Sequence, residues 1–335
     1  MQHRLFGNHS ERISEVGLGT WQLGGTEWGD ISDATAFDVL KTACDAGITF
    51  FDTAEIYGGG RSEQLIGSFL QKLGPAARKI NIATKLGRRF DAPNGWPGNF
   101  TLSAMRLHTQ ESLKRLGIEQ IFLQQFHCIP FEVLKAEIVF ENMRTLQKEG
   151  LIRYWGASVE TVEEGLFCLQ QPGCSALQVI FNILRQKLCT ELLPQAMEKG
   201  VAILARVPLA SGLLSGTFRP GQTFTANDHR SFNANGEKFN VGETFAGVPL
   251  EKGMEVVEKI RAILKPTANV PLATKALRWV LDHPAVSSVI PGATKTEQIA
   301  INSTASDIPP LASQTHEQLR QLYDSEIHSL IRGRY

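Results

Sequence analysis

The chain lacks an excess of either charge, since its 335 residues include 34 Lys and Arg residues and 34 Asp and Glu residues. Proteins that bind nucleic acid usually carry a basic excess or a basic stripe, so this balance argues against such a partner. Long apolar runs are also missing: none reaches the roughly 20 residues that a bilayer-spanning helix needs. The N-terminus, from Met1 to Gly7, lacks the apolar core of a secretion signal. The sequence therefore predicts no membrane and no nucleic-acid partner.

Cysteine is scarce, with five residues and no pair at the CxxC spacing of metal ligands. Unpaired thiols of this kind are typical of a reducing compartment, and we expect a cytoplasmic protein. The composition, 42% hydrophobic and 20% charged, favours a packed core over disorder. No linker-like tract divides the chain, so we expect residues 1–335 to form one domain. The oligomeric state stays open, a homo-oligomer included.

Strand-like segments alternate with segments of helical periodicity along most of the chain. Eight β units with interleaved helices predict an α/β fold, the closed parallel (β/α)8 TIM barrel, rather than an open sheet. The strands are expected at residues 15–18, 49–51, 80–84, 121–125, 154–157, 177–180, 202–205 and 286–290. The helices are expected at residues 35–46, 62–71, 103–116, 131–148, 162–170, 190–199 and 273–282.

Three segments depart from this repeat. Residues 3–6 and 11–14 predict an N-terminal β-hairpin that plugs the bottom of the barrel. A polar stretch at 217–248, rich in Gly and Asn, is long enough to be a lid or a disordered loop. Residues 315–331 predict an extra C-terminal helix.

The run Asp-Thr-Ala-Glu-Ile-Tyr-Gly at 52–58 places a carboxylate and a phenol five residues apart, directly after a short apolar segment. Tyrosine is a poor acid with a pKa of about 10, and a nearby cation would lower that pKa. Lys85 is a candidate because it follows another strand-like run. A strand-end Asp52 and an exposed turn Tyr57 without chemical roles are the plainer alternative, and this run alone leaves both open.

The active site of a barrel of this kind lies at the carboxyl ends of its strands, where Asp52, Lys85 and His127 fall, with Tyr57 close by. Lys85 can lower the pKa of the phenol, and Asp52 can keep Lys85 charged. His127 can donate a hydrogen bond to a carbonyl oxygen. Taken singly, Lys85 would be expected to be a solvated side chain and His127 a core residue. Four such residues at one face of the barrel favour a role in proton transfer. Ser158, Gln178 and Asn182 belong to the next strands of the same face.

In these motifs the chain resembles the aldo-keto reductase family, from about residue 18 to residue 302. Residues 51–58 with Ser62-Glu63 match that family's first signature. Further matches recur in the family's order at Ala83-Thr84-Lys85, His127, residues 156–158, residues 178–182 and residues 290–293. Residues 208–216 are most similar to the bacterial branches.

The resemblance implies an NAD(P)-dependent oxidoreductase that reduces aldehydes or ketones, or oxidises alcohols or sugars in reverse, with no metal. Tyr57 would be the proton donor, Lys85 and Asp52 would tune it, and His127 would align the carbonyl. The substrate is then a small carbonyl compound or alcohol. Its pocket is expected to be walled by Trp21, Trp28, Tyr57, Trp96, Phe126 and His127.

The cofactor implied by the resemblance is NADP(H) rather than NAD(H). Gln298 stands where many members have an arginine against the 2′-phosphate, so Lys295 or Arg230 would substitute. Arg206 stands where an aromatic residue commonly stacks on the nicotinamide, and its charge should disfavour the oxidised ring. The expected cofactor contacts are Gly19, Thr20, Trp21, Asp52, Ser158, Gln178, Arg206, Pro208, Leu209, Ser211, Gly212, Leu214, Pro291, Gly292, Ala293, Thr294, Gln298 and Asn302.

Two other functions remain open from the sequence. The fold also serves channel-associated regulatory subunits, so a protein that senses nicotinamide nucleotides with little turnover is the main alternative. A metal-dependent lyase, or an aldolase that uses Lys85 as a Schiff base, is the other, although the strand ends lack a clustered His, Asp and Glu set.

Overall fold

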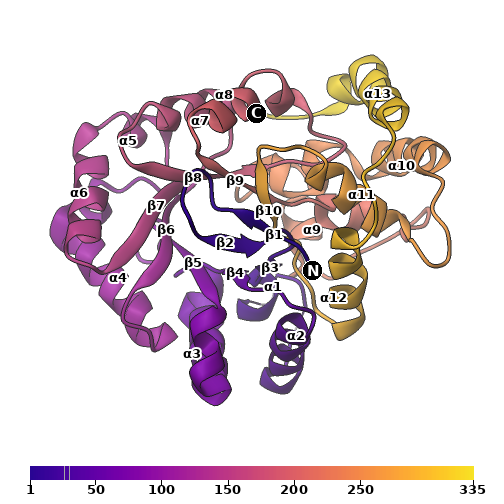
Figure 1. The fold of residues 1–335 in the computed structure, drawn as a ribbon. Helices are drawn as coiled ribbons and strands as arrows, with labels where there is room; N and C mark the ends of the chain where they lie inside the picture. The colour runs from indigo at the N-terminus through magenta and orange to yellow at the C-terminus, as the bar shows by residue number, and fades with distance from the viewer. Residues whose placement is uncertain (26, 30) are drawn as a thin grey trace.

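The structure is a computed structural model that describes residues 1–25, 27–29 and 31–335. Its core is a sheet of eight parallel strands in chain order, surrounded by helices (Figure 1). The strands are β3 (Leu18–Gly19), β4 (Phe50–Asp52), β5 (Asn81–Leu86), β6 (Ile121–His127), β7 (Ile152–Ser158), β8 (Cys174–Ile180), β9 (Ala202–Arg206) and β10 (Val286–Val289).

Backbone hydrogen bonds between the first and last strands close the sheet into a barrel. Gly17 N donates to Val289 O at 2.8 Å, and Val289 N donates to Glu15 O at 2.9 Å. Gly19 N donates to Pro291 O at 3.1 Å. The predicted (β/α)8 barrel is thereby confirmed. A closed barrel leaves no free strand edge, which suits strands as apolar as these.

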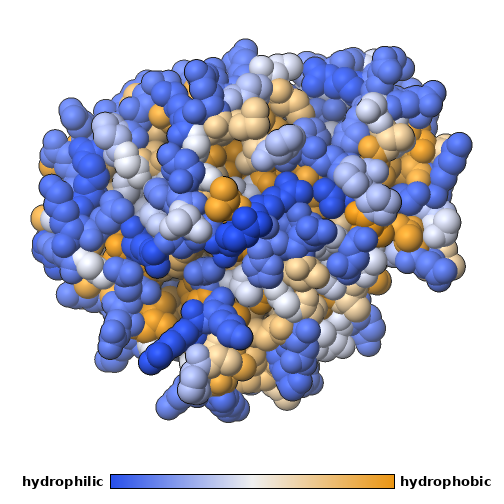
Figure 2. Space-filling model, in the orientation of Figure 1, coloured by the Kyte–Doolittle hydropathy of each residue, from blue (hydrophilic) through white to orange (hydrophobic). Residues whose placement is uncertain are grey.

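The N-terminal hairpin consists of β1 (His3–Leu5) and β2 (Arg12–Ser14) and covers the amino-terminal end of the barrel (Figure 1). Phe6 is fully buried and its ring lies 5.0 Å from that of Phe122, at the start of β6. Asn8 N donates to Gly200 O at 2.8 Å. The hairpin therefore plugs the barrel bottom as predicted, and the face it presents is mostly hydrophilic (Figure 2).

Helices between the strands cover the outside of the barrel, close to their predicted places. One prediction was wrong, because residues 131–148 form two helices rather than one, with a break at Lys135 and Ala136. The helices are α2 (Asp33–Asp45), α3 (Arg61–Leu73), α4 (Leu102–Leu116), α5 (Phe131–Leu134), α6 (Glu137–Lys148), α7 (Val162–Leu169), α8 (Leu192–Glu198), α11 (Leu272–Leu281) and α12 (Thr296–Ser303).

The extra C-terminal helix begins as α13 (Ser313–Leu322) and loosens into a π turn (Tyr323–Ile327) and a 3-10 turn (His328–Leu330). The long helix α10 (Leu250–Leu264) was not predicted. It lies between β9 and β10 in addition to α11, so it falls outside the simple alternation of one strand and one helix on which the predictions were based. No helix in the described part of the chain has both the length and the apolarity to cross a bilayer.

The polar stretch after β9 is an ordered cover built of short turns. It contains α9 (His229–Phe232) and 3-10 turns at Val241–Glu243 and Phe245–Gly247. Arg332 holds this cover from the C-terminal side, donating to Asn235 Oδ1 at 2.8 Å, Ala234 O at 2.9 Å and Gly247 O at 3.0 Å. We call residues 217–248 the cover segment. The structure therefore shows an ordered segment here rather than a disordered loop.

Candidate active site

A cavity of about 660 Å³ opens at the carboxyl ends of the strands, a volume typical of small-molecule sites. Residues from the strand ends, the cover segment and the start of α12 line it. The predicted site residues that line it are Gly19, Thr20, Trp21, Trp28, Asp52, Tyr57, His127, Ser158, Gln178, Arg206, Pro208, Leu209, Ser211, Gly212, Pro291, Gly292, Ala293, Thr294, Gln298 and Asn302.

Five predicted residues, Lys85, Leu214, Phe126, Trp96 and Lys295, are not among those that line the cavity. Lys85 lies behind Asp52 with a side chain only 1% exposed. Leu214 and Phe126 are fully buried in the hydrophobic core. Trp96 is 55% exposed at the start of the turn Pro97–Phe100. Phe126 and Trp96, predicted as walls of the substrate pocket, and Leu214, predicted as a cofactor contact, therefore do not line the cavity.

Asp52, Lys85 and Tyr57 form one contact chain. Lys85 Nζ donates to Asp52 Oδ1 at 2.6 Å and to Thr53 O at 2.8 Å, and it lies 3.3 Å from the Tyr57 hydroxyl oxygen. The second carboxylate oxygen of Asp52 accepts from Gln178 Nε2 at 2.7 Å. Asp52 thus orients the Lys85 ammonium, which faces the Tyr57 hydroxyl, and Gln178 of β8 holds Asp52 in place.

Burial and charge compete for the pKa values of this chain. Burial opposes the ammonium form of Lys85, yet the Asp52 carboxylate and the Tyr57 hydroxyl raise its pKa above the ordinary value. Burial raises the pKa of Tyr57, and the opposing effect of Lys85 does not cancel it. Lys85 therefore lowers the pKa of the Tyr57 phenol as predicted, but the effect of burial is larger. Tyr57 remains a protonated hydroxyl, as a proton donor must be, beside a charged lysine.

His127 ends β6 and lines the cavity with its ring centroid 5.7 Å from that of Tyr57. Burial holds the pKa of His127 well below its usual range, and the charges of Arg88, Lys85 and Arg206 lower it further. The imidazole is therefore neutral at physiological pH. A neutral imidazole can donate one hydrogen bond into the cavity, as alignment of a carbonyl oxygen requires.

Aromatic rings wall the cavity beside Tyr57. The Trp21 ring lies 6.2 Å from the Tyr57 ring, 5.7 Å from Trp28 and 5.9 Å from Phe239. Phe239 belongs to the cover segment, as does His229, whose ring lies 4.3 Å from Trp28. Trp21 and Trp28 are therefore placed where the sequence predicted, and the cover segment completes the wall.

Arg206 is not an isolated charge. Its NH1 group pairs with Glu243 Oε1, and its NH2 group lies 3.2 Å from Val159 O and 3.4 Å from Cys128 Sγ. The positive charge that Arg206 was expected to add is therefore balanced by a neighbouring carboxylate. This partner could not be recognised from the sequence, because Glu243 lies 37 residues further on in a stretch without periodicity.

The far end of the cavity lies at the beginning of α12. Gln298 Oε1 accepts from Thr294 N at 2.7 Å and Lys295 N at 3.2 Å, so this amide orders the turn before the helix. The Arg230 guanidinium donates to both Asp228 oxygens, at 2.6 and 2.9 Å, and lies over the Phe224 and Trp28 rings. Arg230 thus lines the cavity but already pairs with Asp228, whereas Lys295, directly before α12, is not among the lining residues.

Several lining residues escaped the sequence-based prediction, namely Gln22, Glu27, Arg88, Phe239 and Glu243. The Gln22 side chain is nine-tenths buried, and its Oε1 has no partner among the described residues. Its position directly after Trp21 could have marked it as a site residue. Across the described residues, no group of three or more His, Cys, Asp and Glu side chains is placed to hold a metal ion.

Comparison with known proteins supports one family. The model of the Aldo/keto reductase family matches residues 15–324. The chain is 28% identical over 300 residues to aldo-keto reductase YhdN of Bacillus subtilis, covering 89% of this chain and 87% of that protein. It is 30% identical over 328 residues to a probable voltage-gated potassium channel subunit beta of Oryza sativa subsp. japonica, covering 93% of each.

Solved structures agree with these matches. A glycerol dehydrogenase of Gluconobacter oxydans superposes with a TM-score of 0.80 at 25% identity, covering 99% of this chain and 98% of the other. An aldo-keto reductase of Bacillus halodurans, in its holo form, gives 0.76 at 25% identity and covers 96% of each chain. With sequence, fold and nearly full coverage in agreement, this chain belongs to the aldo-keto reductase family.

Proposed function

We propose that this oxidoreductase reduces aldehydes or ketones with NAD(P)H, or oxidises alcohols or sugars in the reverse direction, and that Tyr57 is its general acid. The observation that carries the proposal is the 3.3 Å contact between Lys85 Nζ and the Tyr57 hydroxyl, inside a cavity that His127 also lines. A carbonyl oxygen between Tyr57 and His127 would accept one hydrogen bond from the phenol and one from the imidazole.

Each residue has a defined part in the proton transfer. The carbonyl oxygen gains negative charge as its carbon is reduced, and Tyr57 then gives it the phenolic proton. The charged Lys85 stabilises the resulting phenolate, and Asp52 keeps Lys85 oriented. Neutral His127 donates to the same oxygen and fixes its direction. Displacement of water by a substrate held against the aromatic wall would strengthen these interactions.

The cavity fits a nicotinamide dinucleotide, which would supply or accept the hydride. Ser158 Oγ lies 3.5 Å from Gln178 Oε1, and the pair offers a donor and an acceptor to a carboxamide. Gln22 Oε1 and Arg206 Nε are buried without partners among the described residues, and both residues line the cavity. Unpaired buried polar atoms are costly, and a polar ligand would satisfy them.

NADP(H) is the proposed cofactor in preference to NAD(H). Lys295 precedes α12, and both its cationic side chain and the amide groups at the helix N-terminus favour a phosphate nearby. Gln298 orders the turn that presents these groups.

The test is turnover by the purified chain with an aromatic aldehyde and NADPH or NADH, followed by loss of reduced-cofactor absorbance and by isolation of the alcohol. We expect turnover with both and a higher kcat/KM with NADPH. Nucleotide binding with no alcohol formed from any member of a broad carbonyl panel would contradict the proposal.

A second candidate is a nucleotide-sensing regulatory subunit. The observation that favours it is the similarity to the rice protein, whose name is that of a probable channel subunit. The contact between Lys85 and Tyr57 supports the enzyme more strongly, because a sensor needs no proton donor. Tight binding of both nucleotides without turnover would favour the sensor.

A further inference from the structure

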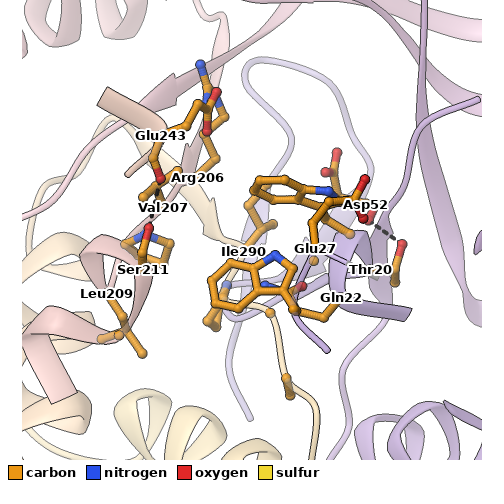
Figure 3. Close-up of a pocket in the computed structure, with 18 of the residues that line it drawn as sticks. Thr20, Gln22, Glu27, Asp52, Arg206, Val207, Leu209, Ser211, Glu243 and Ile290 are labelled. Carbon is orange, nitrogen blue, oxygen red and sulfur yellow. Dashed lines mark hydrogen bonds and ion pairs between the residues drawn. The ribbon is translucent and has the colours of Figure 1, made fainter. Parts of the chain in front are cut away.

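Arg206 and Glu243 form a buried ion pair at the side of the cavity, between the barrel and the cover segment. Arg206 is the last residue of β9, and Glu243 is the last residue of the turn Val241–Glu243. Their side chains are 9% and 13% exposed, and they point toward one another (Figure 3). Ser211 Oγ donates to Glu243 O at 2.8 Å, which fixes the backbone behind the carboxylate.

This pair lies at the hydride-transfer end of the cavity. Arg206 NH2 lies 3.4 Å from Cys128 Sγ, and Cys128 Sγ lies 3.4 Å from Ser158 Oγ. Ser158 in turn contacts Gln178, which holds Asp52. Arg206 and Glu243 therefore lie within a few side-chain contacts of the Tyr57 site, and both line the same cavity.

A nicotinamide ring that donates or accepts hydride must lie at this end, and its charge depends on its oxidation state. The oxidised ring is a cation and the reduced ring is neutral, whereas the two forms share the phosphates, riboses and adenine. The ratio of the two dissociation constants therefore isolates how the site treats the charge of the ring. A lone guanidinium beside the ring would penalise the oxidised form.

We propose that Glu243 sets the relative affinity for oxidised and reduced cofactor by neutralising Arg206. This inference rests on the proposed function, since it presumes a nicotinamide nucleotide in the cavity. Glu243 acts through Arg206 and through the field at the ring, so it is a positioning and charge-balancing residue rather than a proton donor. It also explains how the site can hold an arginine here and still bind the cationic ring.

A purely mechanical role for the pair makes a different prediction. If the pair only held the cover segment against the barrel, its loss would weaken both forms of the cofactor alike. The charge-balancing role requires the two affinities to move apart, and in opposite directions when one or the other partner is removed.

The experiment measures the dissociation constants of NADP⁺ and NADPH separately, by titration of tryptophan fluorescence or by calorimetry, without substrate. In Glu243→Gln we expect the ratio of the NADP⁺ constant to the NADPH constant to rise about 10-fold, the effect of one uncompensated charge several ångströms away. In Arg206→Met the uncompensated carboxylate should lower the ratio. The double variant should return it close to that of the parent chain.

Two further variants complete the set. Glu243→Asp keeps the carboxylate and should keep the parental ratio, and Glu163→Gln removes an exposed carboxylate on α7 as a matched control. Circular dichroism checks that each variant is folded, and Arg206→Met gives an independent test if Glu243→Gln does not fold. An unchanged ratio in Glu243→Gln and Arg206→Met, with normal binding by the parent, overturns this inference alone. A parent chain that binds neither nucleotide overturns the proposed function as well.

Discussion

Lys85 Nζ lies 2.6 Å from an Asp52 carboxylate oxygen, closer than its 3.3 Å approach to the Tyr57 hydroxyl. The two charged side chains are 1% and 4% exposed, so water screens their attraction only weakly. Asp52 is therefore the closer partner of the Lys85 ammonium, and the Tyr57 hydroxyl is the more distant one.

Replacing Lys85 with Met should destabilise the protein by about 3 to 5 kcal/mol, because the Asp52 carboxylate is then buried without its counter-ion. Urea unfolding measures the loss. The double variant Lys85→Met/Asp52→Asn removes both charges and should recover much of the stability but none of the activity. Equal stability of parent and Lys85→Met would contradict the buried ion pair.

Replacing Tyr57 with Phe should lower kcat for carbonyl reduction by about 10² to 10⁴-fold, the usual contribution of a general acid. The ring stays, so its contact with Trp21 and the affinity for NADPH should remain. Steady-state kinetics and a binding titration on the same preparation separate the two effects. Unchanged kcat would exclude Tyr57 as the acid.

Glu55 should make the protein less stable as the pH rises. Burial raises its pKa to about 7, although the Gly87 N–H group and Arg89 oppose the rise. The folded state therefore binds a proton more tightly than the unfolded chain, and this stabilisation is lost as the pH rises from about 4.5 to about 7. Between pH 5 and pH 8, the unfolding free energy of the parent should fall by about 2 kcal/mol more than that of Glu55→Gln. Parallel pH curves for parent and variant would contradict this assignment.

Replacing Lys295 with Ala should raise the dissociation constant for NADPH about 5-fold, the value of one exposed ion pair, and leave that for NADH unchanged. Parallel fluorescence titrations measure both constants. Arg230→Met serves as a comparison, since Asp228 already pairs with that guanidinium. Equal effects of Lys295→Ala on both cofactors would place the 2′-phosphate elsewhere.

The barrel and the polar residues at its strand ends could be predicted from the sequence, because both depend on local patterns. Strand periodicity located β4 and β6 to within two residues, and their carboxyl ends carry Asp52 and His127. The pairing of Arg206 with Glu243 could not be predicted, because it depends on how an aperiodic segment folds back over the barrel. The burial that raises the pKa of Tyr57 could not be predicted for a related reason, since burial is a property of the whole fold.

The proposed proton-transfer residues and the residues that complete the cavity wall come from different parts of the chain. Asp52, Lys85 and His127 come from barrel strands, whereas Phe239, His229 and Glu243 come from residues 217–248. On the proposed function, exchanging residues 217–248 among homologues should change which carbonyl compounds are accepted and leave Asp52, Lys85 and His127 unaltered. Evolution, or an engineer, could thus diversify substrates in one contiguous stretch of the gene.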